Sequence, residues 1–363
     1  MTQLSFYFTE GIRIFNKSLK SRFTKKKYSG KAREICQQIV KDCWNDHFFQ
    51  TSNNNFNQFW TRDFGWCCKS LLQLGYQKEV HQTLRYALNR FQKYHQITTT
   101  ITPGGRPYNF PIAAVDTLPY LIHSIKISQF PYYSFKSFLN HHIKLFYQQF
   151  IDPVTGLVKP NLHPSSMKDF SVRKSSCYDN TLAALLAKDL KDMRLDNPFQ
   201  KYDYPQLLKQ HFWNGTYFYD DITKQEYVAG DANVFPFALG IIQDKEMLES
   251  ALKSIQEAEL DHPLPLKYTQ KTAPVKFIWQ ELFFKGYELD AVWTHMGPLY
   301  IQLLKKIDLE KAKQHKQAYT DMIERYQNYL EVFTTQNNQV KPFQTFYYVC
   351  DRGMLWAANY LTI

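Results

Sequence analysis

Acidic residues recur at the predicted starts of helices, and the clearest example is the segment Phe59–Trp66. There Arg62 and Asp63 lie between aromatic residues, and apolar residues follow at the spacing of a one-sided α-helix. Alone, such an aspartate usually caps free N–H groups at the positive end of the helix dipole. Several of them around one cavity would instead supply the two carboxyl groups of glycoside hydrolysis, one to protonate the leaving oxygen and one to activate water or attack the sugar. Aspartates are also found at four other predicted helix N-termini, namely Asp116, Asp179, Asp231 and Asp351.

The predicted helix starts are spaced regularly enough to define an architecture. They fall near positions 63, 116, 179, 231, 293 and 351, at intervals of 52 to 63 residues, the length of two helices with their connections. A second helix is predicted in each interval. The helix that starts near 351 is expected to pair with a helix near the N-terminus. Six helical hairpins predict an all-α fold, an (α/α)6 barrel closed into a toroid. These second helices are expected at 78–94, 134–147, 203–211, 245–258, 309–331 and 29–48.

Two further features complete the predicted organisation. Alternating apolar residues at 216–228 predict a small β-hairpin on the rim of the barrel. The segment Arg13–Arg33 carries nine basic residues and no acidic one, which leaves only +2 of the net charge of +11 for the rest of the chain. We therefore expect a basic N-terminal arm over residues 1–28 and a single catalytic domain over 29–363. The arm could contact nucleic acid or an anionic membrane, but a solvated surface segment is the favoured interpretation.

The composition agrees with a soluble protein that has one large core or two modest ones. The 363 residues are 44% hydrophobic and 17% aromatic, and the low count of 13 glycines disfavours a sandwich of many short strands. No apolar run approaches the roughly 18 residues that cross a membrane, and Met1–Glu10 lacks the layout of a secretory signal. A cytoplasmic location is expected. The six cysteines show no Cys-x-x-Cys spacing and His295 has no second histidine four residues away, so we expect neither a metal nor another cofactor.

Five short motifs resemble those of the six-hairpin (α/α)6-barrel glycosidases. That family includes glycogen-debranching amylo-1,6-glucosidases, glucoamylases and trehalases. The resemblance covers residues 56–363 and depends on the order and spacing of the motifs, while the N-terminal arm lies outside it. The motifs are Trp60–Asp63, Tyr178–Asn180, Gly230–Pro236, Trp293–Gly297 and Gly353–Tyr360.

The resemblance implies roles for individual residues. Arg62 and Asp63 would bind sugar hydroxyl groups, and Trp60 or Trp66 would stack on a sugar ring. The general acid would be Asp179, with Asp169 as its alternative. Glu331 would be the general base, and Glu281, Glu288 and Glu324 are further candidates. The whole expected substrate-binding set is Trp60, Arg62, Asp63, Trp66, Asp116, Tyr178, Asp231, Trp293 and His295.

The resemblance also implies an inverting hydrolase that cleaves an α-linked glucoside or oligosaccharide. Inverting enzymes hold their two carboxyl groups about 6.5–9.5 Å apart, so that a water molecule fits between them and the sugar. Two other classes of function stay open. One is an epimerase, lyase or phosphorylase on the same barrel, although the nearly isolated His295 disfavours an epimerase. The other is a carbohydrate-binding protein without catalytic activity.

Overall fold

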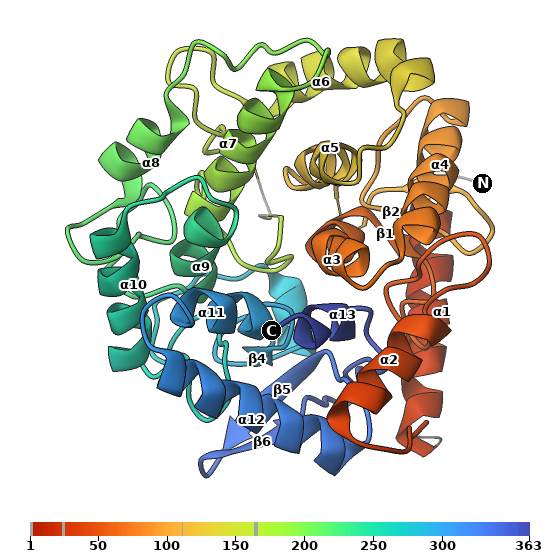
Figure 1. Ribbon diagram of the computed structural model, residues 1–363, viewed down its shortest axis with the longest axis vertical. Helices are drawn as coiled ribbons and strands as arrows, with labels where there is room; N and C mark the ends of the chain where they lie inside the picture. Colours follow the sequence, from red (N-terminus) through yellow and green to blue (C-terminus); the bar gives the residue numbers. More distant parts are fainter. Residues whose placement is uncertain (1–2, 24–25, 111, 163–165) are drawn as a thin grey trace.

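Six inner helices form a closed ring in the computed structural model, which describes residues 3–23, 26–110, 112–162 and 166–363 (Figure 1). Each inner helix packs against the next one along the chain, and the last packs against the first. The predicted (α/α)6 barrel is therefore confirmed. The inner helices are α3 (Thr61–Gln73), α5 (Thr117–Ile127), α7 (Cys177–Lys191), α9 (Gly230–Ala238), α11 (Gly297–Leu304) and α13 (Ala357–Leu361).

A second layer of helices surrounds this ring. Each outer helix follows an inner one, except for α2, which comes from the N-terminal part of the chain and packs against α12 and α13. The sixth hairpin thus takes its outer helix from the N-terminal region, as the sequence predicts. The outer helices are α2 (Ala32–Asp42), α4 (Gln77–Lys93), α6 (Lys136–Phe150), α8 (Tyr204–Phe212), α10 (Lys245–Glu257) and α12 (Leu309–Tyr326), and two short 3-10 helices are η1 (Tyr133–Phe135) and η2 (Trp279–Phe283).

Inner and outer helices differ in how much of their surface is buried. In α2, Ile35, Cys36, Ile39 and Val40 are fully buried, while the residues between these pairs face solvent. Burying one aliphatic side chain of this kind stabilises the fold by about 1.5–3 kcal/mol. In contrast, α7 is buried around nearly its whole circumference, as expected for a helix with neighbours on all sides.

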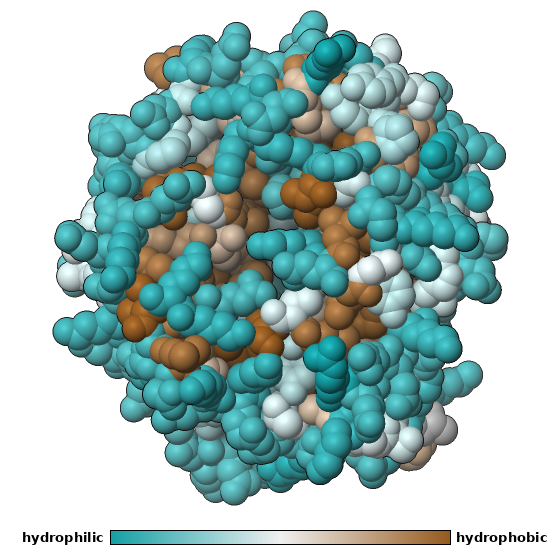
Figure 2. Space-filling view, in the orientation of Figure 1, coloured by the Kyte–Doolittle hydropathy of each residue, from teal (hydrophilic) through white to brown (hydrophobic). Residues whose placement is uncertain are grey.

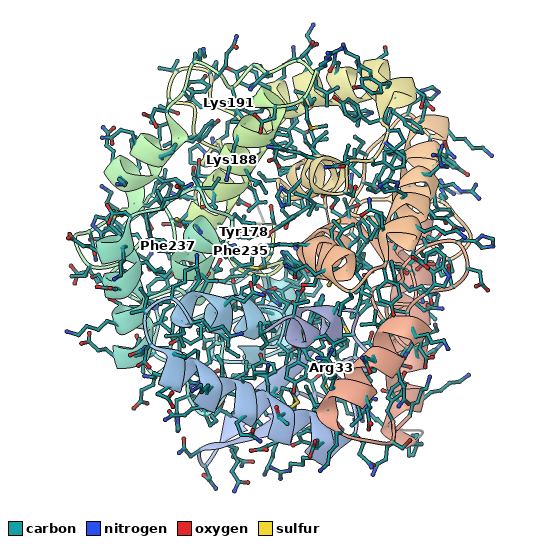
Figure 3. All side chains as sticks on the ribbon, viewed as in Figure 1. Arg33, Tyr178, Lys188, Lys191, Phe235 and Phe237 are labelled. Atoms are coloured by element: carbon teal, nitrogen blue, oxygen red, sulfur yellow. The ribbon has the colours of Figure 1, made fainter. Side chains whose placement is uncertain are left out.

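The inner helices approach one another closely. Tyr178 of α7 and Phe235 of α9 lie near the middle of the ring in Figure 3, and their rings meet edge to face with centroids 4.9 Å apart. Gly65 lies where α3 crosses α5, and a Cβ atom at this position would be 2.5 Å from Cβ of Tyr120. On the face shown in Figure 2, hydrophobic residues gather around a hollow near the centre, and hydrophilic residues cover the periphery.

Two small antiparallel sheets lie in the connections that enter the inner helices. One contains β1 (Phe59–Trp60), β2 (Thr100–Ile101) and β3 (Pro107–Tyr108). The other contains β4 (Val292–Trp293), β5 (Val332–Gln336) and β6 (Gln339–Pro342), and β5 and β6 form a hairpin. These sheets fix Trp60 and Trp293 at the entrances of α3 and α11.

A small β-hairpin is present on the barrel, but β5 and β6 form it. The prediction that residues 216–228 form the hairpin is wrong. That segment contains bends, turns and isolated antiparallel bridges, such as that of Phe218 with Trp213, but no strand. The amide group of Asn233 instead satisfies the backbone of Phe218, because it accepts from the Phe218 N–H at 2.7 Å and donates to the Phe218 carbonyl at 3.0 Å.

Much of the predicted N-terminal arm is a helix, α1 (Gln3–Phe23), that docks on the barrel. Arg13 donates to the side-chain oxygen of Asn57 at 2.9 Å, and Ser18 accepts from the Val349 N–H at 2.6 Å. Arg22 donates to the carbonyl oxygen of Phe346 at 2.6 Å. Over the described residues, this segment is therefore an ordered layer on two loops rather than a free arm. None of the described helices is both long and apolar enough to span a lipid bilayer.

Candidate active site

A cavity of about 490 Å³ opens at the N-terminal ends of the inner helices. Its walls are mainly aromatic, and this volume lies within the usual range for small-molecule sites. The aromatic lining consists of Phe15, Phe56, Trp60, Trp66, Phe110, Phe170, Tyr268, Phe283, Phe284, Tyr287, Trp293, Tyr347, Tyr348 and Trp356. Charged groups reach the cavity from one arginine and four acidic residues, namely Arg62, Asp63, Asp169, Glu288 and Glu331.

Arg62 and Asp63 are held in the first turn of α3. The Arg62 guanidinium pairs with Asp116 at 3.3 Å, donates to the carbonyl oxygen of Ser166, and lies over the Trp66 ring at 5.5 Å. Asp63 accepts a hydrogen bond from the indole N–H of Trp356 at 3.0 Å. Burial raises the pKa of Asp63 to about 6, although Arg62 and the Trp356 hydrogen bond oppose this shift.

Glu331 lies just before β5, and three donors fix its carboxylate. Tyr287 and Tyr348 donate through their hydroxyl groups, at 2.6 Å for Tyr287, and the Asp351 N–H donates at 2.8 Å. Burial raises the pKa of Glu331 to about 7, and the nearby Asp351 carboxylate adds to this shift. The three donors favour the ionised form and keep the pKa from rising further.

Asp169 reaches the same cavity from the loop before α7, and Glu288 holds that loop in place. The Glu288 carboxylate accepts from the backbone N–H groups of Asp169 at 2.6 Å, Phe170 at 2.9 Å and Ser171 at 2.9 Å, and from the Ser171 hydroxyl at 3.0 Å. Burial raises the pKa of Asp169 well above its ordinary value; Arg62 opposes this shift, and the Glu288 charge adds to it. Burial raises the pKa of Glu288 to about 7 against the effect of its hydrogen bonds.

The structure brings most of the sequence-predicted site residues together at this cavity, but not all of them. Asp116 lies behind Arg62, where it also accepts from the Tyr178 hydroxyl at 3.2 Å. His295 is buried under the cavity floor and stacks on Trp66 with ring centroids 4.1 Å apart. Asp116, Tyr178, Asp179, Asp231 and His295 are not among the residues that line the cavity, whereas Trp60, Arg62, Asp63, Trp66, Asp169, Trp293 and Glu331 are.

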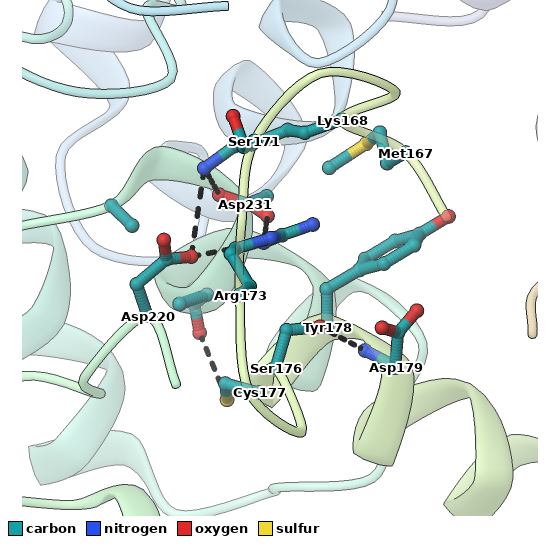
Figure 4. Close-up of polar contacts among 12 residues, drawn as sticks. Met167, Lys168, Ser171, Arg173, Ser176, Cys177, Tyr178, Asp179, Asp220 and Asp231 are labelled. Atoms are coloured by element: carbon teal, nitrogen blue, oxygen red, sulfur yellow. Dashed lines mark hydrogen bonds and ion pairs between the residues drawn. The ribbon is translucent and has the colours of Figure 1, made fainter. Parts of the chain in front are cut away.

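Asp231 belongs to a buried ion-pair cluster instead of the cavity wall (Figure 4). Its carboxylate pairs with Lys168 at 2.9 Å and with Arg173 at 2.6 Å, and Arg173 also pairs with Asp220 at 2.9 Å. Burial opposes ionisation of Asp220, but the two cations lower its pKa to about 2. The cluster ties the loop before α7 to the start of α9, and the Asp231 carboxylate is engaged in these ion pairs rather than exposed to the cavity.

Asp179 lies in the first turn of α7, close to this cluster (Figure 4). Its backbone N–H is capped by the Ser176 hydroxyl at 3.0 Å, and its side chain is buried. The expectation that all helix-start carboxylates share one cavity is therefore wrong. Of the five aspartates, Asp63 alone is among the lining residues, and Asp351 is bound by the loop at 52–56 through Ser52 and the Asn55 N–H.

Sequence reasoning missed the residues that arrive from irregular segments. Tyr287 and Tyr348 orient Glu331, and Lys168 and Arg173 fix the loop that carries Asp169. These residues lie outside helices and strands, where no periodicity marks a buried position. Within the described residues, no group of three or more His, Cys, Asp or Glu side chains is arranged to hold a metal ion.

Comparison with known proteins identifies the fold. No protein-family model and no curated protein sequence matches the chain. The rhamnosidase from Klebsiella oxytoca with rhamnose bound is similar, with a TM-score of 0.63 at 8% identity, over 93% of this chain and 65% of the rhamnosidase. A glycosidase variant in complex with glucose has a TM-score of 0.64 at 9% identity, over 97% and 96% of the two chains.

A third similar structure is the GH63 mannosylglycerate hydrolase from Thermus thermophilus in complex with glucose. Its TM-score is 0.60 at 11% identity, over 91% of this chain and 98% of the hydrolase. The chain therefore spans nearly the whole length of two of these proteins and about two thirds of the rhamnosidase. At such low identity the likeness establishes the fold, the six-hairpin barrel of these glycosidases.

Proposed function

We propose that the protein is an inverting glycoside hydrolase that removes a glucose-like sugar from an α-linked glycoside. The observation that carries the proposal is that Asp169 and Glu331 line one aromatic cavity beside Arg62 and Asp63. Glycoside hydrolysis needs a protonated and an ionised carboxyl group around one sugar. The two similar glycosidase structures that contain glucose support a glucose-like sugar in this cavity.

Asp169 is proposed as the general acid in place of Asp179. It lines the cavity, and burial raises its pKa well above the ordinary value, which keeps the proton that the leaving oxygen must receive. Asp179 is not a lining residue. We therefore choose Asp169 over Asp179 because it lines the cavity. The family resemblance implies the opposite preference.

Glu331 is proposed as the general base. The hydroxyl groups of Tyr287 and Tyr348 and the Asp351 N–H stabilise its ionised form and fix its direction. In the proposed reaction, Glu331 takes a proton from a water molecule while that water attacks the anomeric carbon. Asp169 gives its proton to the glycosidic oxygen as the bond to the leaving group breaks, so the product has the opposite anomeric configuration.

The sugar is proposed to be gripped by Arg62 and Asp63. The Asp63 carboxylate accepts from Trp356 and has further acceptor capacity for sugar hydroxyl groups. Trp60, Trp66 and Trp293 offer aromatic surface for the faces of the ring. Because His295 is buried beneath Trp66 and is not a lining residue, it does not reach a sugar in the cavity, which disfavours an epimerase.

The test compares Asp169→Asn, Glu331→Gln and Asp179→Asn on two kinds of substrate. Positioned acid and base groups contribute about 10²–10⁴-fold each, so the first two variants should lose about that factor in kcat on an α-linked disaccharide. On an aryl glycoside with a good leaving group, Asp169→Asn should lose much less activity, because that leaving group needs no proton, and Glu331→Gln should lose as much as before. Asp179→Asn is the matched control and should stay active.

Proton NMR of the first product formed supplies the stereochemical test, with inversion expected. Full activity of Asp169→Asn on the disaccharide, together with loss in Asp179→Asn, would restore Asp179 as the acid. Epimerised or phosphorylated products would replace the hydrolase with one of the other barrel enzymes. Tight sugar binding without turnover by the wild-type protein would indicate a carbohydrate-binding protein.

A further inference from the structure

Exposed aromatic side chains form a continuous rim at the mouth of the cavity. We call Trp279, Phe283, Phe346 and Tyr347 the mouth rim. Their rings contact one another in sequence, with centroids 5.9 Å apart for Trp279 and Phe283, 5.0 Å for Phe283 and Tyr347, and 5.1 Å for Tyr347 and Phe346. Phe283 and Tyr347 also line the cavity, so the rim leads directly into the candidate active site.

The rim is unusually exposed for apolar residues. Trp279 is 67% exposed and Phe346 77%, and Leu282 on the same short helix as Trp279 is 76% exposed. Isolated exposed apolar residues are common, but a connected group of large ones marks a surface that binds something. We therefore expect the rim to bind a partner that has an apolar surface.

Helix α1 extends the rim and brings positive charge to it. Phe15 and Gly11 of α1 line the cavity, and Arg22 binds the carbonyl oxygen of Phe346. Lys276 and Lys285, on either side of η2, are exposed. The surroundings of the rim thus combine apolar side chains with cationic ones from two distant parts of the chain, while Glu281 of η2 accepts from the Gly286 N–H at 2.7 Å.

We propose that the mouth rim binds an anionic lipid membrane, and that the sugar entering the cavity is carried by a lipid. The second part rests on the proposed hydrolase function. Proteins that lie on a bilayer insert apolar side chains into the boundary between headgroups and acyl chains and place lysines and arginines over anionic headgroups. A rim of this composition at the cavity mouth presents the cavity to a sugar that projects from the membrane.

Charge and side-chain type favour a lipid surface over two other occupants. A second copy of this chain, docked rim to rim about a two-fold axis, would bring the same cationic groups against one another. A long sugar chain could stack on the rings, but it would leave the exposed Leu282 without an apolar partner and the lysines without an anionic one. An anionic membrane offers acyl chains to the apolar side chains and anionic headgroups to the cationic ones.

Binding is tested by flotation of the full-length protein with vesicles of phosphatidylcholine containing about 30% phosphatidylserine, and with vesicles of phosphatidylcholine alone. The double variant Trp279→Ser/Phe346→Ser should lower the fraction bound to the anionic vesicles by about tenfold. Lys276→Glu/Lys285→Glu should weaken binding to anionic vesicles, and added salt should do the same to the wild-type protein.

The matched control is Tyr133→Ser/Leu309→Ser. These residues are 65% and 53% exposed and follow the C-terminal ends of α5 and α11, at the opposite end of the barrel from the cavity. This variant should bind vesicles as the wild-type protein does. The proposal would be overturned if the control variant lost vesicle binding to the same extent, or if the wild-type protein did not bind vesicles. Binding to a single-stranded oligonucleotide in place of vesicles would also overturn it. So would dimerisation that the rim variant abolishes.

The lipid-linked substrate is tested with a glucosyl lipid embedded in the same vesicles and with a soluble aryl glucoside. The rim variant should lose activity on the embedded lipid by about the factor by which it loses binding, and it should keep wild-type activity on the soluble substrate. Equal rates on the embedded lipid would contradict the substrate assignment. Because vesicle binding is measured without turnover, failure of the hydrolase proposal would leave the binding result interpretable.

Discussion

At the scale of single residues, the site depends on carboxyl groups with different surroundings. Glu331 receives three hydrogen bonds that favour its ionised form, while Asp169 lies beside the Glu288 carboxylate, which favours a protonated neighbour. Arg62 lies near Asp63, Asp116 and Asp169 and opposes protonation of all three. The arrangement separates the two proposed catalytic groups by their environment rather than by their chemical type.

The pH dependence of kcat/KM should reflect this separation. Activity requires ionised Glu331, whose pKa is raised to about 7, so kcat/KM should fall as the pH drops below about 7. On the alkaline side it should fall when Asp169 loses its proton. A full profile across the acidic, neutral and alkaline range checks this. An acid limb near the ordinary carboxyl value would exclude Glu331 as the base.

The same shift affects stability with a defined sign. The folded protein holds the Glu331 proton up to about pH 7, whereas the unfolded chain releases it near 4.5. The contribution of Glu331 to stability is therefore fully present below 4.5 and is lost as the pH rises to about 7.

Tyr348→Phe tests how the base is positioned. The variant removes one hydroxyl donor to the Glu331 carboxylate and so should raise its pKa, which moves the acid limb of the profile to higher pH. The value of kcat should fall as well, while KM for a soluble substrate should change little. Tyr347→Phe is a suitable control, because Tyr347 lines the cavity and is not one of the donors that hold Glu331. An unchanged acid limb in Tyr348→Phe would show that this hydrogen bond has only a structural role.

At the scale of elements, the site depends on how closely the inner helices pack. The N-terminal turn of α3 carries Arg62 and Asp63, and its position is set by the contact of α3 with α5. Gly65 allows that contact because a side chain there would meet Tyr120. The loop that carries Asp169 is fixed in a different way, through the ion pairs of Lys168 and Arg173 with the start of α9.

Gly65→Ala should therefore destabilise the protein by about 1–3 kcal/mol, the usual cost of overpacking a core. The added Cβ atom would lie 2.5 Å from the Tyr120 Cβ atom, so α3 and α5 must separate. Urea unfolding followed by circular dichroism measures this change. Gly11→Ala is the control, since a Cβ atom at that helical position has no atom within 4 Å, and it should be neutral or slightly stabilising.

At the scale of the whole molecule, the sequence predicts the ring better than it predicts the site. The spacing of apolar residues locates the inner helices, because each must bury a face. The family resemblance points to Arg62, Asp63 and Glu331, and these three residues line the cavity. Asp179 and Asp231 are not among the lining residues, because being in the first turn of a helix does not decide whether a carboxylate faces a cavity or an ion pair. For Asp231 that depends on Lys168 and Arg173, which lie in an irregular loop and reach their partners only in the folded chain.

The closed ring should unfold as one unit. Ile39→Ala in α2 removes a fully buried side chain from the closing hairpin and should cost about 2–5 kcal/mol. Circular dichroism reports all helices, while tryptophan fluorescence reports seven tryptophans, four of which line the cavity, namely Trp60, Trp66, Trp293 and Trp356. Both signals should shift together to lower urea concentration. Separate transitions would show that the closing hairpin melts independently of the cavity.

Pairing of α2 with α13 has a consequence for biosynthesis. The apolar face of α2 emerges from the ribosome about 300 residues before α13, its partner in the ring. At about 5–20 residues per second, that interval is roughly 15–60 s. During translation the face of α2 that carries Ile35 and Ile39 lacks its contact with α13, so we expect the nascent chain to bind holdase chaperones until α13 is made.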